Sequence, residues 1–391
     1  MKYIGVLTLV FQNYGTRLQS YALSKILEKI KPNDTCVEII DLETTWTDKP
    51  LSYLHFLGKI VRAYKLKAIF YIFNLIRWII ENRKINKQDY SEERQKRFSL
   101  FSSIISQIPY TKHKYTCNEI RKGMLKDYDA IIVGSDQVWN GIKVRNQDVF
   151  GLKFFSKLKL TYAASFGMTS IPPKLLDDYK KNIISFDKLL MREQEGADIC
   201  KALGRNDAEI VLDPTLLLNE QDYNSLVSHS ELNISGDYIL VYSLNYSYKI
   251  FKQAHKLAKQ NHCKTIVLKR SICPPNVSKF DDVQELYAVS PEGFLWLVKH
   301  AKCVITNSYH ALLFSVNFKT DFYLYLDNCD EENSRMLTII RMLNLERLVF
   351  WETQNLPLEF PKINFNKPDK TIESQRLHSI ELLKESLKKL V

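Results

Sequence analysis

The stretch Tyr128–Asn140, which reads YDAIIVGSDQVWN, constrains the fold more than any other part of this chain. Ala130–Val133 is a short apolar, β-branched run, typical of a strand buried on both faces in a parallel sheet covered by helices. Gly134 ends the run and permits close backbone approach. Open α/β sheets bind ligands just beyond the carboxyl ends of their strands, so the polar residues that follow are candidate binding residues. The same residues also suit an ordinary strand followed by a capped helix.

Similar strand endings recur through the first half of the chain. Its other predicted strands are Tyr3–Val10, Cys36–Leu42, Leu158–Ala164, Lys188–Met191 and Ala208–Leu212. A turn at 11–16 after the first strand leads into an amphipathic helix, the opening of a nucleotide- or anion-binding half-domain. Four successive strands would place Asp136, Ser165, Arg192 and Asp213 at corresponding positions, and this convergence is more informative than any one residue.

The second half repeats the α/β pattern from about residue 219. Its predicted strands are Tyr238–Ser243, Lys264–Leu268, Cys303–Thr306 and Phe322–Leu326. Ser290 begins a helix as its cap. A chain of 391 residues suits two α/β domains. We therefore predict Rossmann-like domains at 1–218 and 219–391, with an amphipathic C-terminal helix at 372–390 returning to the first domain.

Composition sets the class of protein. The chain is 45% hydrophobic and 25% charged, as expected of a soluble globular protein. Its seven cysteines are odd in number, irregularly spaced and lack a Cys-x-x-Cys pair, which favours a reduced cytoplasmic compartment over a disulfide framework or zinc site. The N-terminus does not have the pattern of a signal peptide.

The net charge of +11 is unevenly distributed, because residues 51–90 carry six of the eleven charges. This segment belongs to a basic, aromatic insertion at about 51–107. The apolar run Ala68–Ile80 is too short to span a membrane, but its basic and aromatic flanks suit a helix lying in the membrane interface. A helical insertion packed on its own domain is the alternative. Concentration of charge in one apolar segment disfavours nucleic acid as a partner.

His310 is the best single catalytic candidate, because it lies in a strand-to-helix loop and imidazole exchanges protons near neutral pH. A histidine that only caps or packs is the alternative. Arg192 and Lys319 are candidate anion ligands, although each alone is more often a solvated surface charge. The sequence lacks the dinucleotide glycine fingerprint, a P-loop lysine, a serine nucleophile elbow, a carboxylate pair for glycoside hydrolysis and a histidine-rich metal cluster.

These residues together resemble the polysaccharide pyruvyl transferase family. The matching segments, in family order, are Asn13–Leu23, Tyr128–Asn140, Tyr162–Gly167, Arg192–Glu193, Leu212–Thr215, Thr306–His310, Phe314–Val316 and Lys319. The Gly-Ser-Asp-x-x-Trp-Asn element is the most distinctive of them. Thr16 and Ala311 depart from the residues common in the family, and the insertion at 51–107 is not shared. These departures bear on the acceptor sugar more than on the donor.

The resemblance implies a fold similar to the two-domain glycosyltransferase-B type, with the site in the cleft between domains. It implies transfer from phosphoenolpyruvate to two hydroxyls of a surface polysaccharide (exopolysaccharide or capsule) or its lipid-linked precursor, as a ketal, without a metal or other cofactor. His310 and Asp136 would be catalytic. The implied donor ligands are Arg192, Lys319, Asn307 and Ser308. The implied acceptor or cleft residues are Asn13, Tyr14, Gly15, Ser135, Trp139, Asn140 and Ser165, with Trp139 stacking on the sugar ring.

Two other functions remain open from the sequence. A nucleotide-sugar-dependent glycosyltransferase would have the same sheets and a similar basic lining. A non-catalytic scaffold docked on the membrane would keep the fold and bind no donor. The expected location is the cytoplasm, and the membrane hypothesis would place the enzyme at the inner face of the cell membrane.

Overall fold

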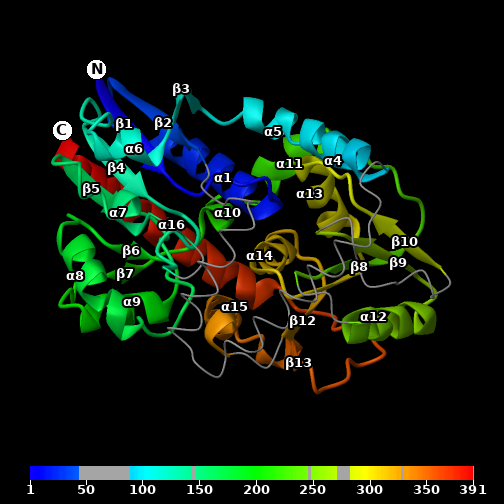
Figure 1. The fold of residues 1–391 in the computed structure, drawn as a ribbon. Helices are drawn as coiled ribbons and strands as arrows, with labels where there is room; N and C mark the ends of the chain where they lie inside the picture. Colours follow the sequence, from blue (N-terminus) through cyan, green and yellow to red (C-terminus); the bar gives the residue numbers. More distant parts are fainter. Residues whose placement is uncertain are drawn as a thin grey trace.

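The computed structural model describes residues 1–43, 89–141, 144, 146–244, 248–270, 282–326 and 330–390. The first sheet is wholly parallel, with strand order β3-β2-β1-β4-β5 (Figure 1). Its strands are β1 (Lys2–Leu7), β2 (Thr35–Leu42), β3 (Tyr110–Tyr115), β4 (Ala130–Val133) and β5 (Leu158–Thr161). A short parallel pair, β6 (Leu190–Met191) and β7 (Glu209–Ile210), follows β5 through single bridges from Leu160 to Lys188 and from Ala164 to Met191.

Helices cover this sheet and extend from it toward the second. They are α1 (Tyr14–Ile30), α4 (Asp89–Leu100), α5 (Ser102–Ser106), α6 (Cys117–Arg121), α7 (Gln147–Phe150), α8 (Leu176–Ile184), α9 (Gln194–Ala202) and α10 (Pro214–Leu217). Helix α1 begins at Tyr14 because the Asn13 side chain caps it by accepting a hydrogen bond from the Thr16 amide.

The second sheet is also parallel and has the order β10-β9-β8-β11-β12-β13. Its strands are β8 (Tyr238–Tyr242), β9 (Lys264–Leu268), β10 (Val283–Leu286), β11 (Cys303–Thr306), β12 (Phe322–Leu326) and β13 (Val349–Trp351). Its helices are α11 (Glu220–Ser228), α12 (Tyr248–Gln260), α13 (Pro291–His300), α14 (Tyr309–Asn317), α15 (Asp330–Leu343) and α16 (Asn366–Leu387). Short 3₁₀ turns occur at Pro173–Leu175, Glu346–Leu348 and Lys388–Leu390.

Helix α16 runs back from the second sheet to the first, so that both chain ends lie at the same end of the molecule (Figure 1). The Ser379 hydroxyl accepts a hydrogen bond from the Leu212 amide at 3.0 Å, and the Arg376 guanidinium donates to the Leu216 carbonyl at 2.8 Å. The Lys2 ammonium donates to the Leu390 carbonyl. The contacts of Leu212 and Leu216 hold the segment after β7 against α16, and the contact of Lys2 holds the end of the chain near β1.

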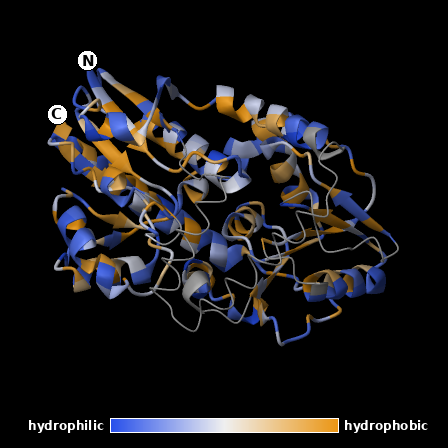
Figure 2. Ribbon diagram, viewed as in Figure 1, coloured by the Kyte–Doolittle hydropathy of each residue, from blue (hydrophilic) through white to orange (hydrophobic). Residues whose placement is uncertain are grey.

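The central strands of both sheets are buried and apolar, as Figure 2 shows by their hydrophobic colouring. The bounds of β4, β9, β11 and β12 match the prediction, and Ser290 caps α13 as expected. The edge strands β3, β10 and β13 were not predicted. Edge strands have one unpaired side and tolerate polar residues, so β3 carries Lys112, His113 and Lys114 on its exposed part and lacks a buried apolar run.

The membrane hypothesis for 51–90 falls almost wholly outside the described residues. The rest of the predicted insertion forms α4 and α5, which reach across to the second sheet. The Arg97 guanidinium donates hydrogen bonds to the Lys269 and Arg270 carbonyls at 3.1 and 3.2 Å. Among the described helices, none combines the length and the apolar character that crossing a membrane requires.

Candidate active site

Asp136 lies just beyond Gly134 and Ser135, which follow β4, and it has a left-handed backbone with φ of 78°. The capped helix that the sequence allowed here does not form. Instead, Asp136 makes a bridge with Ala164, and its carbonyl accepts a hydrogen bond from the Ser165 amide at 3.1 Å. A non-glycine residue at positive φ needs such support, and it costs of order 1–3 kcal/mol. This local backbone directs the Asp136 carboxylate toward Thr16, whose hydroxyl donates to it at 3.4 Å.

Arg192 is the centre of the charged cluster, and its side chain is completely buried. Its guanidinium lies 3.1 Å from the Asp213 carboxylate, 3.5 Å from Asp136 and 3.6 Å from Glu193. Burial opposes the charged form, but Tyr309, Asp136, Asp213 and Glu193 together raise the pKa of Arg192. Arg192 therefore stays charged and joins the ends of β4, β6 and β7.

Two carboxyl groups beside Arg192 have pKa values that are shifted in opposite directions. Burial raises the pKa of Glu193, which accepts a hydrogen bond from the Ser165 hydroxyl at 2.6 Å. Burial would also raise the pKa of Asp136, but Arg192, His310 and Arg335 outweigh it and hold that pKa below its ordinary value. Asp136 is therefore an ionised carboxylate near neutral pH, with its side chain 14% exposed.

His310 completes the cluster. It lies in the first turn of α14, which follows β11 of the second sheet. Its Nε2 atom lies 3.9 Å from the Asp213 carboxylate, which also accepts a hydrogen bond from the Ser135 hydroxyl at 3.2 Å. This Nε2 atom is buried, and none of the described residues forms a hydrogen bond with it. Burial lowers the pKa of His310, and the nearby Asp213 and Asp136 only partly offset it. The resting imidazole is therefore neutral and has an unused nitrogen.

Gly15, in the first turn of α1, packs directly on the His310 ring. A Cβ atom at position 15 would lie 2.0 Å from His310 Nδ1, well inside van der Waals contact. Glycine is therefore required here for close approach rather than for an unusual backbone angle. The first turn of α1 and the first turn of α14 thus fix each other.

Changing Gly15 to alanine should move the imidazole away from the cluster. We expect the added methyl group to cost about 1–3 kcal/mol of unfolding free energy and to lower the rate of the catalysed reaction about 10²-fold, because reacting groups tolerate little displacement. Urea denaturation and steady-state kinetics measure the two effects. Gly196→Ala is the control, since its Cβ would meet only the flexible end of Met191 closely, at 3.1 Å. A folded Gly15→Ala protein with full activity would show that the position of His310 does not matter.

Two members of the cluster, Tyr309 and Arg335, were not singled out from the sequence. Arg335 comes from α15 and lies against the side-chain amide of Gln137; with that amide oriented so that its oxygen faces the guanidinium, the N–O distances are 2.9 to 3.3 Å. The guanidinium carbons of Arg192 and Arg335 lie 4.7 and 5.3 Å from the centre of the buried Tyr309 ring. No local pattern marks Arg335, because only the folded chain brings α15 to β4. The tyrosine beside His310 could have been found as part of the 307–310 loop.

Several predicted acceptor residues instead hold the structure together. Trp139 is only 1% exposed and donates its indole N–H to the Phe150 carbonyl, so it offers no open face for sugar stacking. Tyr14 is stacked on Phe294 with ring centres 4.7 Å apart. Asn140 is also buried, and its amide donates to the Gly167 carbonyl. Of the predicted residues Asn13, Tyr14 and Gly15 at the start of α1, Asn13, the helix cap, is exposed and the other two are buried.

The predicted donor ligands are not all brought together. Ser308 caps α14 by accepting from the Ala311 amide, and the Asn307 side chain accepts from the Leu244 amide at 2.7 Å. Both lie beside His310, but these side chains are engaged with backbone groups. Lys319 lies beyond the opposite end of α14, where it pairs with Asp369 at 2.6 Å and is about half exposed. It is therefore separated from Arg192 by the length of the helix.

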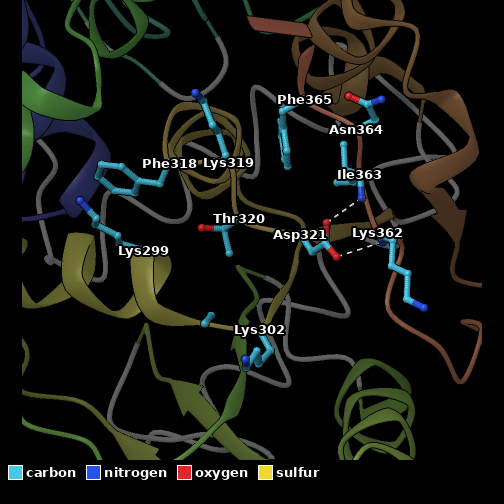
Figure 3. Close-up of a pocket in the computed structure, with 11 residues that line it drawn as sticks. Lys299, Lys302, Phe318, Lys319, Thr320, Asp321, Lys362, Ile363, Asn364 and Phe365 are labelled. Atoms are coloured by element: carbon cyan, nitrogen blue, oxygen red, sulfur yellow. Dashed lines mark hydrogen bonds between the residues drawn. The ribbon is translucent and has the colours of Figure 1, made fainter. Parts of the chain in front are cut away.

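Lys319 lines a surface pocket of about 560 Å³ (Figure 3). Three further lysines line it: Lys299, Lys302 and Lys362. Lys299 and Lys302 pair with Glu220 and Asp237 at 2.8 and 3.3 Å. With Asp321 in the wall, the lysine charge is largely balanced, and the pocket lacks the excess charge of an anion site. In the described part of the chain, His, Cys, Asp and Glu residues do not group in a way that could hold a metal ion.

Comparison with known proteins places this geometry in a fold and a family. The structure is similar to UDP-GlcNAc 2-epimerase from Neisseria meningitidis bound to UDP-GlcNAc, with a TM-score of 0.50, 9% identity and 100% of each chain covered. The structure is also similar to UDP-GlcNAc 2-epimerase from Methanocaldococcus jannaschii, with a TM-score of 0.48 and 12% identity, and 97% of this chain and 92% of that chain are covered. For Arabidopsis thaliana UGT89C1 complexed with quercetin, the TM-score is 0.42 at 11% identity, and 99% and 92% are covered.

The likeness to the Neisseria epimerase concerns the fold alone, and it agrees with two Rossmann-like domains of the glycosyltransferase-B type. No curated protein sequence matches the chain. The model of the family described as polysaccharide pyruvyl transferase matches residues 13–329, a span that contains Asp136, Arg192, Asp213 and His310. Because this match covers most of the chain, the protein belongs to the polysaccharide pyruvyl transferase family.

Proposed function

We propose that this protein transfers the enolpyruvyl group of phosphoenolpyruvate to two hydroxyls of a sugar, in a surface polysaccharide or its lipid-linked precursor. The product is a pyruvate ketal, and phosphate is released. The observation that carries the proposal is the meeting of two guanidinium groups, an ionised carboxylate and a neutral histidine where Asp136 and Arg192, beyond β4 and β6, face helices α14 and α15. The family match supplies the class of reaction.

The two arginines suit a donor with two anionic groups. Arg192 is shared among three carboxylates, whereas Arg335 contacts the neutral amide of Gln137. The charge of Arg335 is therefore less neutralised by its contacts. We assign Arg335 to one anionic end of phosphoenolpyruvate and Arg192 to the other, since planar guanidinium groups bind carboxylate and phosphate in two-point contacts. Lys319 has no part in this arrangement.

The reaction requires balanced proton movements. The methylene carbon of the donor gains one proton, the bond between the enol carbon and the phosphate oxygen breaks, and two new bonds join that carbon to the sugar oxygens. Two hydroxyl protons are lost: one balances the proton gained by carbon, and the other leaves on hydrogen phosphate. The site must therefore hold groups that both accept and deliver protons.

His310 and Asp136 fit these two tasks. A neutral imidazole with a free nitrogen can accept a proton, and an arriving phosphate would raise its pKa, because a nearby negative charge favours the protonated form. We assign to His310 the delivery of that proton to the donor. The ionised Asp136, which already accepts a hydrogen bond from Thr16, would orient and deprotonate a sugar hydroxyl.

A thermal-shift titration with phosphoenolpyruvate tests the proposal before any acceptor is known. A ligand that binds only the folded state raises its stability by mass action, by about 2.7 kcal/mol at a hundredfold excess over Kd. We expect phosphoenolpyruvate to raise the melting temperature of the wild type and of Lys319→Ala, and to lose this effect in Arg335→Gln.

A panel of UDP-, GDP- and CDP-sugars provides the comparison in the same titration. A shift with one nucleotide sugar and none with phosphoenolpyruvate would replace the proposal with a nucleotide-sugar-dependent glycosyltransferase. Absence of a shift with every donor would favour a non-catalytic role for the fold.

A further inference from the structure

Tyr309 occupies a special place in the cluster, because its ring contacts both arginines and the histidine. The guanidinium carbons of Arg192 and Arg335 lie over it, 4.7 and 5.3 Å from the ring centre. The His310 ring packs edge-on against it, with ring centres 5.3 Å apart. Tyr309 is only 3% exposed, so these contacts are made away from bulk water.

The Tyr309 ring offsets the repulsion between the two guanidinium groups. Two guanidinium groups near each other repel. Among the described residues, Arg192 forms ion pairs with carboxylates, whereas Arg335 interacts with the charges of Asp136 and Glu193 from a greater distance. The negative π-face of a tyrosine attracts cations, and more strongly where water is excluded. One rigid ring that attracts both groups holds them at a fixed separation, whereas an aliphatic side chain of similar size would fill the space without attracting either.

A fixed separation matters for ligand choice. A ligand with two anionic groups gains from two guanidinium groups only if their spacing matches its own, because otherwise one side chain must move and lose freedom on binding. A ligand with a single anionic group has no such requirement. The arrangement therefore favours a two-ended anion over a simple one without any direct contact from the tyrosine.

We infer that Tyr309 is a positioning residue that fixes the spacing of the Arg192 and Arg335 guanidinium groups, and thereby sets the preference for a donor with two anionic groups over a single anion. The inference rests on the proposed function, since phosphoenolpyruvate is the two-ended anion concerned. The quantity that expresses the preference is the Kd for inorganic phosphate divided by the Kd for phosphoenolpyruvate.

Isothermal titration calorimetry of the full-length protein with both ligands measures this ratio. In Tyr309→Phe the ring remains, and the ratio should stay within about twofold of the wild type. In Tyr309→Leu the ring is lost, and we expect the ratio to fall about tenfold, mostly through weaker phosphoenolpyruvate binding. Enzyme kinetics should show the same split, with a raised KM for phosphoenolpyruvate exceeding the change in kcat. Tyr238→Leu, which removes a buried tyrosine stacked on Trp296, is the matched control.

The outcomes separate the inference from the function on which it rests. If the wild type fails to bind phosphoenolpyruvate, the proposed function falls and this inference with it. If the wild type binds phosphoenolpyruvate and Tyr309→Leu has the wild-type ratio of Kd values, the inference alone is overturned. It is also overturned if the ratio falls as much in Tyr309→Phe as in Tyr309→Leu. Should Tyr309→Leu not fold, Arg335→Lys replaces it: this variant keeps the charge but loses the planar group over the ring, and an unchanged ratio would again overturn the inference.

Discussion

Replacing His310 with glutamine is expected to lower kcat for pyruvyl transfer by about 10²–10⁴-fold, the usual contribution of a placed acid–base group. Glutamine keeps polar atoms in the space between Gly15 and Asp213 but exchanges no protons, so the fold should survive. Product formation measured at saturating donor and acceptor gives the effect. A variant that retains more than about a tenth of wild-type kcat would show that protons reach the donor by another group.

The same variant changes the pH dependence of stability. The pKa of His310 lies below its ordinary value of 6.5 in the folded protein, so the unfolded chain binds a proton first as the pH falls. Stability is then lost as pH falls below about 7, and His310→Gln should lose less between pH 7 and pH 5. The raised pKa of Glu193 acts in the opposite sense but is common to both proteins. Melting curves at each pH test this, with the exposed His378→Gln as control.

Strand endings explain why much of the site could be predicted from the sequence. Parallel strands carry their carboxyl ends to one edge, so Asp136, Arg192 and Asp213 had to come together once their strands were recognised. His310 followed because β11 is a continuous apolar run with a loop after it. In these cases one-dimensional order and three-dimensional proximity coincide.

The sequence misplaced other residues where their order in the chain does not determine which side chains meet in the fold. Lys319 matched a family position, but His310 lies in the first turn of α14 and Lys319 lies beyond the last residue of that helix, Asn317. Trp139 was expected to face a sugar because it follows a site residue, yet it turns inward to pack against Phe166 and Phe186. Arg335 approaches Gln137, in the loop after β4, from α15, and no local pattern encodes that approach. Sequence order thus locates strand ends well and side-chain direction beyond them poorly.

Removing Arg192 should affect stability as well as function. Arg192→Ala should abolish transfer, and the structure also predicts a large loss of stability. The guanidinium is completely buried and is the shared partner of Asp136, Glu193 and Asp213. Breaking a buried ion pair leaves an uncompensated charge and typically costs about 3–5 kcal/mol. Urea denaturation at pH 7 should show a loss of this size.

Lys319→Ala is the natural comparison, because it removes a cation whose ion pair with Asp369 is half exposed. Exposed pairs contribute about 0–1 kcal/mol, so this variant should unfold almost as the wild type does and keep its activity. If Arg192→Ala is as stable as Lys319→Ala, the carboxyl groups around Arg192 must be protonated or solvated in that variant, and Arg192 would no longer be the charge that holds the site together.

Arg192→Lys separates the role of Arg192 in stability from its role in donor binding, since it keeps the charge but loses the planar group over Tyr309. It should recover much of the stability while phosphoenolpyruvate binding remains weak, because charge balance needs only a cation, whereas two-point binding of the donor needs the guanidinium plane.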